Sequence, residues 1–470
     1  EQRALEMVRY SLGRMAAGGI YDHLGGGFAR YSTDERWLVP HFEKMLYDNA
    51  EMVDLLTLAW QGTGERLYAE RVRETIGWVL REMIALDADG RPTLAFASTL
   101  DADSEGVEGK FYVWSEEEID RLLGTGSVPG AAVFKRAYDV SPEGNWEGTN
   151  ILNRSAAPDL GEPAFEEDLA RMRAVLSRAR DERIRPGWDD KVLADWNGLM
   201  IAALANAGFA FDEPAWTAAA AGAFDFVAGT LGAGGRLHHG WRRGVLRHPA
   251  SLDDHANMIR AALALHETTG EARFLERARA WVADLDHRYW DDDGPGRSTG
   301  AGGGYFYTAD DAERLLVRVK SVADQAVPSG NGTMVAALAR LYHLTGETAF
   351  RDRAEALVAA FSGELTRNFF PLATFLNGIE LLQSARQIVV VGDPGDPGRH
   401  ALLDVVRRTA LPNRVLTILD PGASLPPGHP AHGKGPVDGR PAAYVCENAT
   451  CSAPVGEPDA LAARLAEPAA

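Results

Sequence analysis

The stretch MIRAALALHETTGEARFLERARAWVADL, residues 258–285, decides the fold because it joins two different helical patterns through a glycine. Its first part, 258–265, is apolar nearly all round, which is typical of a helix enclosed on every side. Its second part, 274–285, has an apolar stripe and a charged face, which is typical of a helix at the surface. The sequence therefore predicts an inner helix and an outer helix joined by a tight turn at Gly270-Glu271.

The same hairpin recurs along the chain. Gly-Glu turns also occur at 64–65 and 346–347, and Asp212-Glu213 with Trp216 is a degenerate copy. In the three full copies an aromatic residue and then an arginine follow the Glu at intervals of three: Tyr68 and Arg71, Phe274 and Arg277, Phe350 and Arg353. Repeated hairpins of this kind bury their inner helices against one another. We therefore predict an all-α fold, an (α/α)6 barrel or six-hairpin toroid, over residues 1–385, completed by helices near 3–17, 116–123, 131–138, 164–183 and 371–383.

Two kinds of β structure are predicted in addition. Strand-like patches at 93–99, 110–114, 236–241 and 303–308 indicate short β-hairpins at one mouth of the barrel. From residue 386 the pattern changes to RQIVVVG, HALLDVVRRT, NRVLTIL and AAYVC, separated by Gly/Pro-rich linkers. This predicts a small C-terminal α/β appendage, residues 386–470, packed on the barrel. The appendage contains no G-x-G-x-x-G motif, so dinucleotide binding is not expected.

Composition narrows the class of partner. The 470-residue chain has a formal net charge of −19, which argues against nucleic acid and anionic membranes as partners. We find no apolar run long enough to span a bilayer and no signal peptide. The chain has only two cysteines, which favours a reducing compartment and a cytoplasmic location. It also begins without Met and inside a helical pattern, as a fragment of a longer protein would.

A second informative stretch is GGGFARYSTDERWLVPHFEKMLYDNA, residues 25–50. Pro40 suits the first turn of a helix, so we predict an inner helix from Pro40 to about Trp60. On such a helix His41, Lys44 and Asp48 share one face. That row of polar groups is either a buried network that satisfies itself or a surface that faces a ligand.

The starts of the predicted inner helices are all polar. If these helices run parallel around a ring, their N-termini open on one mouth and the residues there converge. Asp195, Asp254 and Ser329 also have a simpler interpretation, since Asp and Ser are ordinary helix caps. Capping does not explain Trp37 and Trp196, and aromatic rings beside acids in a concave site are typical of sugar binding.

Several charged segments have two interpretations. Asp101, Asp103 and Glu105 begin like a calcium loop, but Tyr112 occupies the position of the bidentate Glu, so we predict an acidic loop over the mouth and no metal site. The acid and lysine pairs before two helix starts, Lys191 with its neighbouring aspartates and Lys320 with Asp324, are either parts of the site or surface ion pairs. His238, His239 and His248 lack metal-ligand spacing and are expected to be solvated, and Cys446 and Cys451 are too far apart for a C-x-x-C pair.

The candidate site is therefore a ring of polar groups with no metal and no other cofactor. The candidate catalytic residues are His41 as general acid/base and Asp101, Asp195 and Asp254 as carboxylates. The candidate substrate-binding residues are Arg30, Tyr31, Trp37, Lys44, Asp48, Asp103, Lys191, Trp196, Asn197, Asp253, Tyr305, Lys320, Asp324, Ser329 and Asn331.

Several motifs together resemble one family. Residues 25–50, DADSEGVEGKFYVW (101–114), KVLADWNGLMIAALA (191–205), LDDHANMIRAAL (252–263), VPSGN (327–331) and AYVCENATCSAP (443–454) are similar to the thioredoxin-domain-containing spermatogenesis-associated protein family. The resemblance implies a thioredoxin-like domain ahead of the helical part, which this sequence does not contain. It also implies a helical part like the six-hairpin glycosidases and N-acylglucosamine 2-epimerases. The epimerases use a pair of histidines, for which His41 and, as a weaker second base, His255 are available here.

Two classes of function follow from the sequence. The first is a carbohydrate-active enzyme, epimerase-like or hydrolase-like, acting on a small-molecule carbohydrate. The second is a non-catalytic barrel that binds a glycan or protein partner, or docks the thioredoxin-like domain of the full-length protein. Redox work by Cys446 and Cys451 is a third, more remote hypothesis.

Overall fold

The computed structural model describes residues 2–124, 130–292, 302–447 and 450–467. The chain divides into two compact units, Glu1–Lys191 (unit 1) and Val192–Ala470 (unit 2). None of the helices in the described residues is long and apolar enough to cross a membrane.

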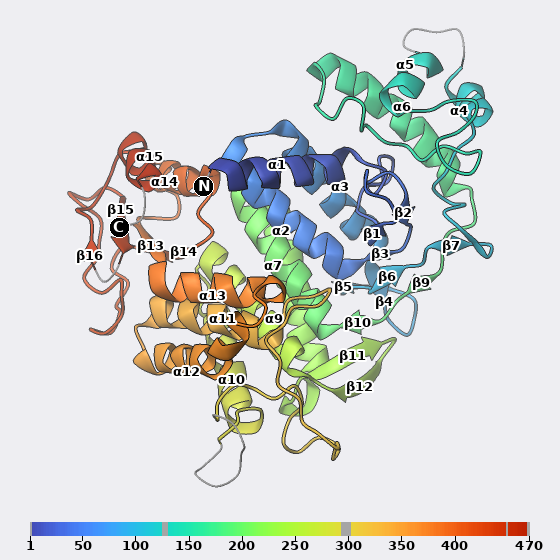
Figure 1. Cartoon of the computed structure of the whole chain (residues 1–470). Coiled ribbons are helices and arrows are strands. Elements are labelled where there is room, and N and C mark those ends of the chain that lie inside the picture. Colours follow the sequence, from blue (N-terminus) through green and yellow to red (C-terminus); the bar gives the residue numbers. More distant parts are fainter. Residues whose placement is uncertain (1, 125–129, 293–301, 448–449, 468–470) are drawn as a thin grey trace. The chain divides into compact units, whose positions relative to one another are not determined.

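Unit 2 is built on helical hairpins of the predicted kind (Figure 1). The inner helices lie side by side in chain order and the outer helices pack on them; they are α7 (Ala194–Ala210) with α8 (Pro214–Phe226), α9 (Leu252–Thr269) with α10 (Ala272–Arg288), α11 (Gly330–Thr345) with α12 (Thr348–Leu365), and α13 (Ala373–Ser384). Every residue of α7 except Trp196 and Asn206 is buried, whereas α10 buries one stripe from Phe274 to Leu285. The difference in burial follows from the apolar patterns of the two kinds of helix.

The Gly-Glu turns end the inner helices as the repeat predicts. Gly270 and Gly346 have φ of 76° and 76°, and each donates its N–H to the last turn of the helix. In unit 1, Gly64 does the same with φ of 71° between α2 (Leu46–Thr63) and α3 (Arg66–Glu82). Glycine enters this left-handed region without the steric cost of a Cβ atom.

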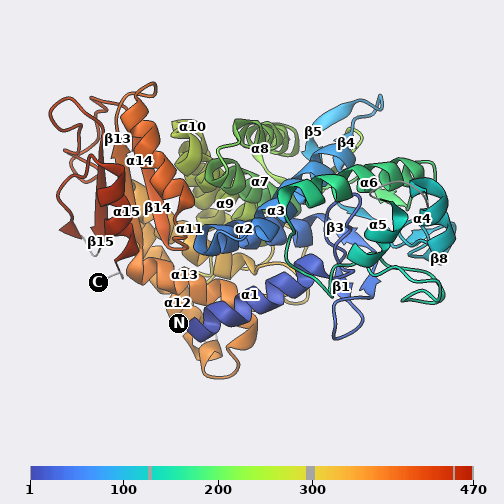
Figure 2. The same ribbon diagram turned by 90° about the horizontal axis from the view of Figure 1, so that it is seen from above.

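Unit 2 also contains the C-terminal α/β part. Its sheet has the strand order β14-β13-β15-β16, and β13 pairs with β14 in parallel and with β15 antiparallel. Helices α14 and α15 lie against this sheet (Figure 2). The elements are β13 (Arg386–Val391), α14 (Pro397–Arg408), β14 (Arg414–Leu419), β15 (Ala442–Glu447), β16 (Thr450–Cys451) and α15 (Pro458–Ala466).

The segments that connect the helical hairpins form short strands. In unit 2 β10 (Val192–Leu193), β11 (His238–Arg242) and β12 (Val245–Pro249) form one sheet. Unit 1 has helices α1 (Gln2–Ala17), α4 (Glu116–Leu123), α5 (Ala131–Ala137) and α6 (Pro163–Asp181), and the strands β1 (Tyr31–Ser32), β2 (Pro40–His41), β3 (Lys44–Met45), β4 (Ile84–Leu86), β5 (Pro92–Phe96), β6 (Thr99–Leu100), β7 (Asp103–Ser104), β8 (Val107–Glu108) and β9 (Trp188–Asp189). The predicted fold class, all-α hairpins of the (α/α)6 type with short β-hairpins and a C-terminal α/β appendage, is confirmed.

The predicted start of the first inner helix is wrong. Helix α2 begins at Leu46, and Pro40–His41 and Lys44–Met45 are strands instead. The backbone before Leu46 pairs with β1 and β6, and the Leu46 N–H donates to the Ser98 carbonyl at 3.0 Å. His41 and Lys44 therefore do not share a helical face with Asp48.

Two of the strand-like patches are also wrong. Segments 110–114 and 303–308 form only single bridges, Trp114 to Asn150 and Trp290 to Tyr305.

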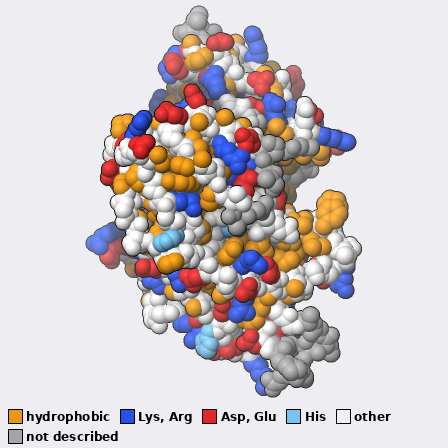
Figure 3. Space-filling view, turned by 90° about the vertical axis from the view of Figure 1, so that its left-hand side faces the viewer, with side chains coloured by type: hydrophobic (Ala, Val, Ile, Leu, Met, Phe, Trp, Pro, Cys, Tyr) orange, Lys and Arg blue, Asp and Glu red, His pale blue; other side chains and the backbone are white. Residues whose placement is uncertain are grey.

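The face of the molecule that Figure 3 shows has no large patch of one charge, because acidic, basic and hydrophobic side chains are mixed across it.

Candidate functional site

Helices α7 and α9 in unit 2 bring acidic residues together at their first turns. Asp195 is the second residue of α7. Helix α9 begins with a capping box, in which Ser251 Oγ accepts the Asp254 N–H and Asp254 accepts the Ser251 N–H. Since α7 and α9 are neighbours, these first turns meet, and the Asp195 N–H donates to Asp254 Oδ1 at 3.1 Å.

Asp254 is the hub of this group, because it is fully buried and both of its oxygens accept hydrogen bonds. Oδ2 accepts from Ser251 N at 2.7 Å and from Ser251 Oγ at 2.8 Å. His239, at the start of β11, has its Nδ1 at 3.0 Å from Oδ1 and 3.1 Å from Oδ2. We call Asp195, His239, Asp253 and Asp254 the Asp254 cluster.

The carboxyl groups of the Asp254 cluster have opposite pKa shifts. Burial and the nearby charge of Asp254 raise the pKa of Asp195 to about 8. Burial and the same neighbour raise the pKa of Asp253 to about 6. Burial alone would also raise the pKa of Asp254, but the hydrogen bonds and charge of His239 and the bonds from Ser251 lower it. At neutral pH the cluster therefore holds an ionised Asp254 beside a protonated Asp195.

A cavity of about 280 Å³ opens between the N-terminal ends of α9 and α11, and Asp253 is the member of the Asp254 cluster that lines it. We call it the mouth cavity. Asp253, Ser329 and Asn331 line it together with Tyr307, whose side chain is 47% exposed. Tyr307 links the cavity to the cluster, since Asp253, Asp254 and Asp195 all contribute to raising its pKa after burial.

The ligand atoms of Asp195, His239 and Asp254 lie within 4.8 Å of one another. Carboxylate and imidazole groups are ligands that Zn²⁺ and Mn²⁺ accept. Both Asp254 oxygens already accept hydrogen bonds from protein donors, so a cation would have to displace at least one of them. Among the described residues, this is the group whose donor set fits a divalent cation.

Other predicted site residues of unit 2 hold the backbone. Asn331 Nδ2 donates to the carbonyls of Tyr305 and Ser321 at 3.0 and 2.9 Å, and Ser329 is the N-cap of α11. Asp324 accepts from the N–H groups of Ser329 and Thr374, both at 2.9 Å. The remaining ones are placed as follows: Asn197 is buried and donates to the Leu193 carbonyl, Trp196 is half-buried, and Lys320 donates to Asp291 and to the Gly303 carbonyl.

The sequence does not predict the positions of two residues of this site, His239 and Tyr307. His239 was expected to be solvated, but it bonds Asp254, since strand β11 places it over the first turn of α9. Tyr305 was expected to bind substrate; its ring is fully buried with the hydroxyl donating to Asp286 at 2.7 Å, and Tyr307 lines the cavity instead. His255, the weaker second base, is buried, with its Nδ1 at 3.0 Å from the Ser251 carbonyl.

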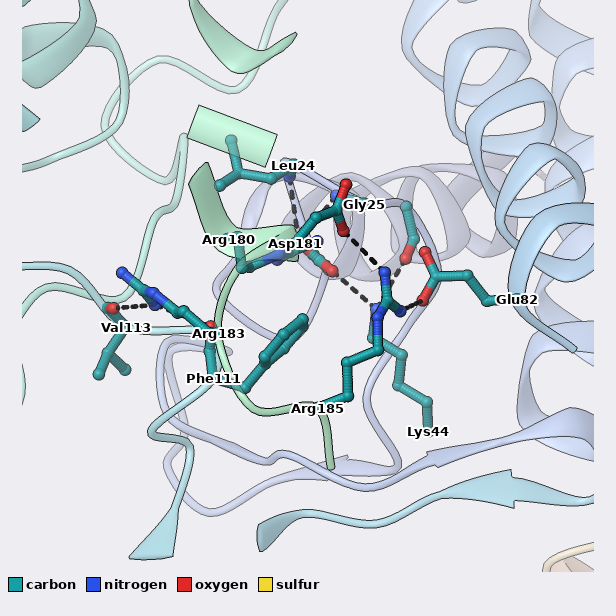
Figure 4. A network of polar contacts seen from close by, with 12 residues as sticks. Leu24, Gly25, Lys44, Glu82, Phe111, Val113, Arg180, Asp181, Arg183 and Arg185 are labelled. Atoms are coloured by element: carbon teal, nitrogen blue, oxygen red, sulfur yellow. Dashed lines mark hydrogen bonds and ion pairs between the residues drawn. The ribbon is translucent and has the colours of Figure 1, made fainter. Parts of the chain in front are cut away.

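In unit 1 the glycine-rich stretch is fixed by a buried ion cluster. Lys44 Nζ donates to Asp22 Oδ2 and to the Gly26 carbonyl, both at 2.8 Å, and Arg180 Nη1 donates to Asp22 Oδ1 at 2.8 Å. Figure 4 shows Lys44 and Arg180 within the surrounding polar network, which includes the Arg185–Glu82 pair at 3.0 Å. We call Asp22, Lys44 and Arg180 the Asp22 cluster. The Lys44 ammonium is thus engaged by protein groups.

His41 lies in a separate, more exposed group of unit 1. Its ring stacks on Tyr31 with centroids 5.0 Å apart, and its Nδ1 is 2.7 Å from Glu108 Oε1. Arg30 forms an ion pair with Glu43 at 3.2 Å. Glu108 was not singled out from the sequence, although it follows the predicted acidic loop by a few residues.

The other predicted residues of unit 1 are scattered. Burial, followed by the charge of Glu51, raises the pKa of Asp48 to about 7. Its Oδ2 is buried and has no hydrogen-bond partner in the part of the chain that the structure describes. The rest are placed as follows: Asp101 and Asp103 are exposed, Lys191 is exposed and pairs with Asp189 at 3.1 Å, and Trp37 is half-buried with φ of 64°.

The two cysteines form a disulfide, Cys446–Cys451, between β15 and β16. With only two cysteines, the sequence predicts no disulfide framework, so this bond was not expected. Their cross-strand register brings them together although they are too widely spaced in sequence for a C-x-x-C motif.

Solved structures with related architecture are remote. They include a sugar epimerase from a ruminal bacterium, 11% identical with a TM-score of 0.43 over 81% of this chain and 71% of that one. Cellobiose 2-epimerase from Bacillus thermoamylovorans is 10% identical with a TM-score of 0.41, covering 81% and 72%. No family model matches the chain.

The sequence relatives are much closer. Spermatogenesis-associated protein 20 of Homo sapiens is 31% identical over 97% of this chain and 62% of its own length, and the protein of the same name from Mus musculus is 32% identical with the same coverage. The chain thus spans 62% of the length of these curated relatives. An uncharacterized protein of Caenorhabditis elegans, B0495.5, is 26% identical over 96% of the chain and 65% of its own length. The resemblance to the spermatogenesis-associated protein family is therefore confirmed, and it extends over nearly the whole of this chain.

Proposed function

We propose that the chain binds a small carbohydrate at the N-terminal ends of α9 and α11 and catalyses proton transfer to and from that carbohydrate. The observation that carries this proposal is the Asp254 cluster, in which two buried carboxyl groups with opposite pKa shifts lie beside a histidine, and a third, Asp253, lines an open cavity. Paired groups whose pKa values are pushed apart are the usual means by which one site supplies both an acid and a base at neutral pH.

Each residue of the cluster has a distinct role in the proposal. The Asp254 carboxylate accepts the Nδ1–H of His239, which leaves Nε2 as the basic atom of the ring. His239 is the residue that takes a proton from the substrate, because its side chain is 33% exposed whereas that of Asp254 is 0% exposed. Asp254 is a positioning residue. Asp195, protonated below about pH 8, donates a proton to a substrate oxygen.

Two features of the mouth cavity favour a sugar as the ligand. A carboxyl group on Asp253 offers hydrogen-bonding oxygens for hydroxyl groups, and the exposed ring of Tyr307 offers an apolar face beside them. A volume of about 280 Å³ suits one sugar ring and its hydration.

On an open-chain sugar, removal of the C2 proton by His239 with protonation of the carbonyl oxygen by Asp195 would give an enediol. Return of a proton to C2 on the opposite face, as the O1 proton leaves, would complete epimerisation, and delivery of a proton to C1, as the O2 proton leaves, would complete isomerisation. Delivery of a proton by Asp195 to a glycosidic oxygen, with a water molecule adding to the anomeric carbon as the glycosidic bond breaks, would give hydrolysis.

The test is exchange of sugar C–H protons with solvent. Mannose, glucose, N-acetylglucosamine and cellobiose are incubated in D₂O and followed by ¹H NMR, with and without EDTA, and nitrophenyl glycosides report hydrolysis. The proposal predicts deuterium at C2 of at least one sugar, or hydrolysis of one glycoside. His239→Gln should lower that turnover about 100-fold or more, since a general base contributes about that factor. His287→Gln, at an exposed position of α10, should leave it unchanged.

Measuring sugar binding as well as turnover distinguishes an enzyme from a barrel that binds a glycan without reacting. If calorimetry detects sugar binding that Asp253→Asn abolishes, but no sugar exchanges and no glycoside is cleaved, the site binds a glycan without reacting. If neither binding nor turnover occurs with any of these sugars, the proposed site is wrong. Roles for His41 and Asp101 of unit 1 stay predictions and are tested by the same assays on His41→Ala and Asp101→Asn.

A further inference from the structure

An exposed apolar segment lies beside the mouth cavity, in the loops that precede α11 (Figure 1). Residues 315–319, Leu-Leu-Val-Arg-Val, lie outside any helix or strand of the described range 302–447. Four of these five residues are apolar and all four are exposed, Leu316 fully and Val317 by 69%. We call Leu315, Leu316, Val317 and Val319 the apolar rim.

Hydrogen bonds hold the apolar rim against the mouth cavity. The Tyr307 N–H donates to the Val319 carbonyl at 2.8 Å, and both residues line the cavity together with Asp253. The guanidinium group of Arg318 fixes the same segment, since it donates to two backbone carbonyls at 2.6 and 3.2 Å. Leu316 is three residues from Val319, a span of at most about 11 Å. The apolar rim therefore continues the surface of the polar cavity outward from Val319.

The composition of the apolar rim indicates what it can bind. A single exposed Leu or Val is ordinary, but a run of them marks a surface that binds another molecule. Aliphatic side chains cannot hydrogen-bond to hydroxyl groups, and they lack the flat ring on which a second sugar could stack. They favour an alkyl or other apolar group, which is removed from water when it covers them. The formal net charge of −19 makes an anionic membrane an unfavourable partner for this surface.

We propose that the mouth cavity and the apolar rim together bind an amphiphilic sugar derivative. The sugar lies in the cavity beside Asp253, and an apolar group attached to it covers Leu316 and Val317. The observation behind this proposal is that the cavity and the rim are continuous, because a ligand that fills both must be polar at one end and apolar at the other. The inference rests on the proposed function, since it uses the same sugar site, and it adds the class of sugar that the site takes.

Matched pairs of probes test the proposal on the full chain. Methyl and octyl β-glucoside, and methyl and octyl α-mannoside, share their sugar and differ in the apolar group, while tetraethylene glycol monooctyl ether has the octyl group without a sugar. Calorimetry below the critical micelle concentrations should give, for at least one sugar, an affinity about 100-fold higher for the octyl than for the methyl glycoside, because each CH₂ group removed from water contributes about fourfold. Cellobiose, with a second sugar ring in place of the octyl group, should show no such gain over methyl glucoside. An equal gain with cellobiose would overturn the choice of an apolar group.

Two variants separate the two ends of the site. Leu316→Ser combined with Val317→Ser should lower the ratio of octyl to methyl affinity about tenfold, because it removes much of the apolar surface. Both positions are exposed, so this double variant is expected to fold. Leu94→Ser, at an exposed position of β5 in unit 1, is the matched control and should leave the ratio as in wild type. Asp253→Asn should weaken the methyl and octyl glycosides by the same factor, since the two share their sugar.

The outcomes distinguish a failure of this inference from a failure of the proposed function. If methyl glycosides bind and Asp253→Asn weakens them, but the octyl group adds nothing or the double Ser variant keeps its full advantage, the sugar site stands and the inference is wrong. The inference is also wrong if the sugar-free ether binds as tightly as the octyl glycosides and Asp253→Asn weakens neither. Binding of wild type, but not of the double Ser variant, to phosphatidylcholine vesicles without sugar would assign the rim to a membrane surface and overturn the inference. If none of the glycosides binds, the proposed sugar site fails and the inference fails with it.

Discussion

Units 1 and 2 each bury an aspartate where several chain segments meet, but the two aspartates have different neighbours. In unit 1 both oxygens of Asp22 face cations, Lys44 and Arg180, at 2.8 Å each. Burial alone would raise the pKa of Asp22, yet these two cations hold it well below its usual range. In unit 2 the Asp254 carboxylate faces another carboxyl group, Asp195, and one half-exposed histidine.

The difference separates a structural cluster from a reactive one. In the Asp22 cluster one carboxylate is held between two cations, and these fixed bonds hold the glycine-rich loop in place. In the Asp254 cluster the neighbouring carboxyl groups of Asp195 and Asp254 cannot both be ionised at low cost, so Asp195 retains a proton at neutral pH. A carboxyl group that is still protonated at neutral pH can act as a proton donor. Strongly shifted pKa values beside an open cavity are typical of active sites. The sign of the charges next to the buried carboxylate, more than burial, distinguishes the two clusters.

The largest effect is expected from breaking the Asp22 cluster. Lys44→Met removes the two hydrogen bonds of a buried ammonium, to Asp22 and to the Gly26 carbonyl, and it should reduce the free energy of unfolding by about 3–5 kcal/mol. Lys110→Met is the matched control, since it removes an ion pair with Glu105 at 2.7 Å whose lysine is 50% exposed. That control should cost less than about 1 kcal/mol in the same urea titration. Equal losses in the two variants would mean that the Asp22 cluster is not a structural lock.

The next effect concerns the hub of the reactive cluster. Asp254→Asn removes the charge that orients His239 and places an amide against the Ser251 donors, so we expect a loss of about 2–3 kcal/mol and of most turnover. Asp253→Asn, the neighbouring residue, should weaken sugar binding with little change in stability, because it accepts one backbone N–H, that of Gly330 at 2.9 Å. Thermal unfolding and calorimetry on both variants separate the two roles. Wild-type turnover in Asp254→Asn would contradict its positioning role.

A smaller effect follows from the proton on Asp195. Activity that needs a protonated Asp195 should decline above about pH 8, with log(kcat/KM) falling by about one per pH unit. Asp195→Asn should show low turnover without this decline. A wild-type profile that stays flat to pH 9.5 would show that Asp195 is not the acid. Asp352→Asn, at an exposed position of α12, is the control for the loss of one carboxylate.

The smallest effect distinguishes two tyrosines of one segment. Tyr305→Phe removes the hydroxyl bond to Asp286 and should cost about 1 kcal/mol of stability without altering sugar binding. Tyr307→Ala removes the exposed ring from the mouth cavity and should weaken sugar binding several-fold with little effect on stability. Calorimetry and thermal unfolding on this pair check both statements. The reverse assignment would restore Tyr305 as the binding residue.

The hairpin architecture could be predicted because its signal is local. The Gly-Glu turns, the all-round apolar helices and their amphipathic partners are each readable within one stretch, and Gly64, Gly270 and Gly346 end helices where the repeat places them. The start of α2 could not be read in this way. Pro40 suits a helix N-terminus, but pairing of the backbone with β1 and β6 takes this segment into strands.

The candidate site was predictable only in part, for a similar reason. Asp195 and Asp254 were found because helix starts carry a sequence signal, and neighbouring inner helices bring those starts together. His239 has no such signal, since strand pairing in a distant β-hairpin places it against Asp254. Segment 303–308 runs from the core, where residues 303–305 are buried, to the surface at Tyr307, so Tyr307 and not Tyr305 lines the cavity. The sequence shows both tyrosines but not the point at which the segment leaves the core.

We infer that Asp195 holds a proton at neutral pH while Asp254 does not, and the pH dependence of stability is the sharpest test of this difference. The folded chain keeps the Asp195 proton up to about pH 8, whereas the unfolded chain releases it near pH 4, so this residue destabilises the fold progressively between those values. An asparagine at position 195 does not titrate, so the variant does not lose stability in this way. Melting temperatures of wild type, Asp195→Asn and Asp352→Asn are compared from pH 6.5 to 8, above the pKa of about 6 of Asp253. We expect the melting temperature of Asp195→Asn to gain about 2 °C or more on that of wild type across this range, with no such trend for Asp352→Asn. A difference in melting temperature that stays constant with pH would show that Asp195 is ionised like an ordinary carboxylate in the folded chain.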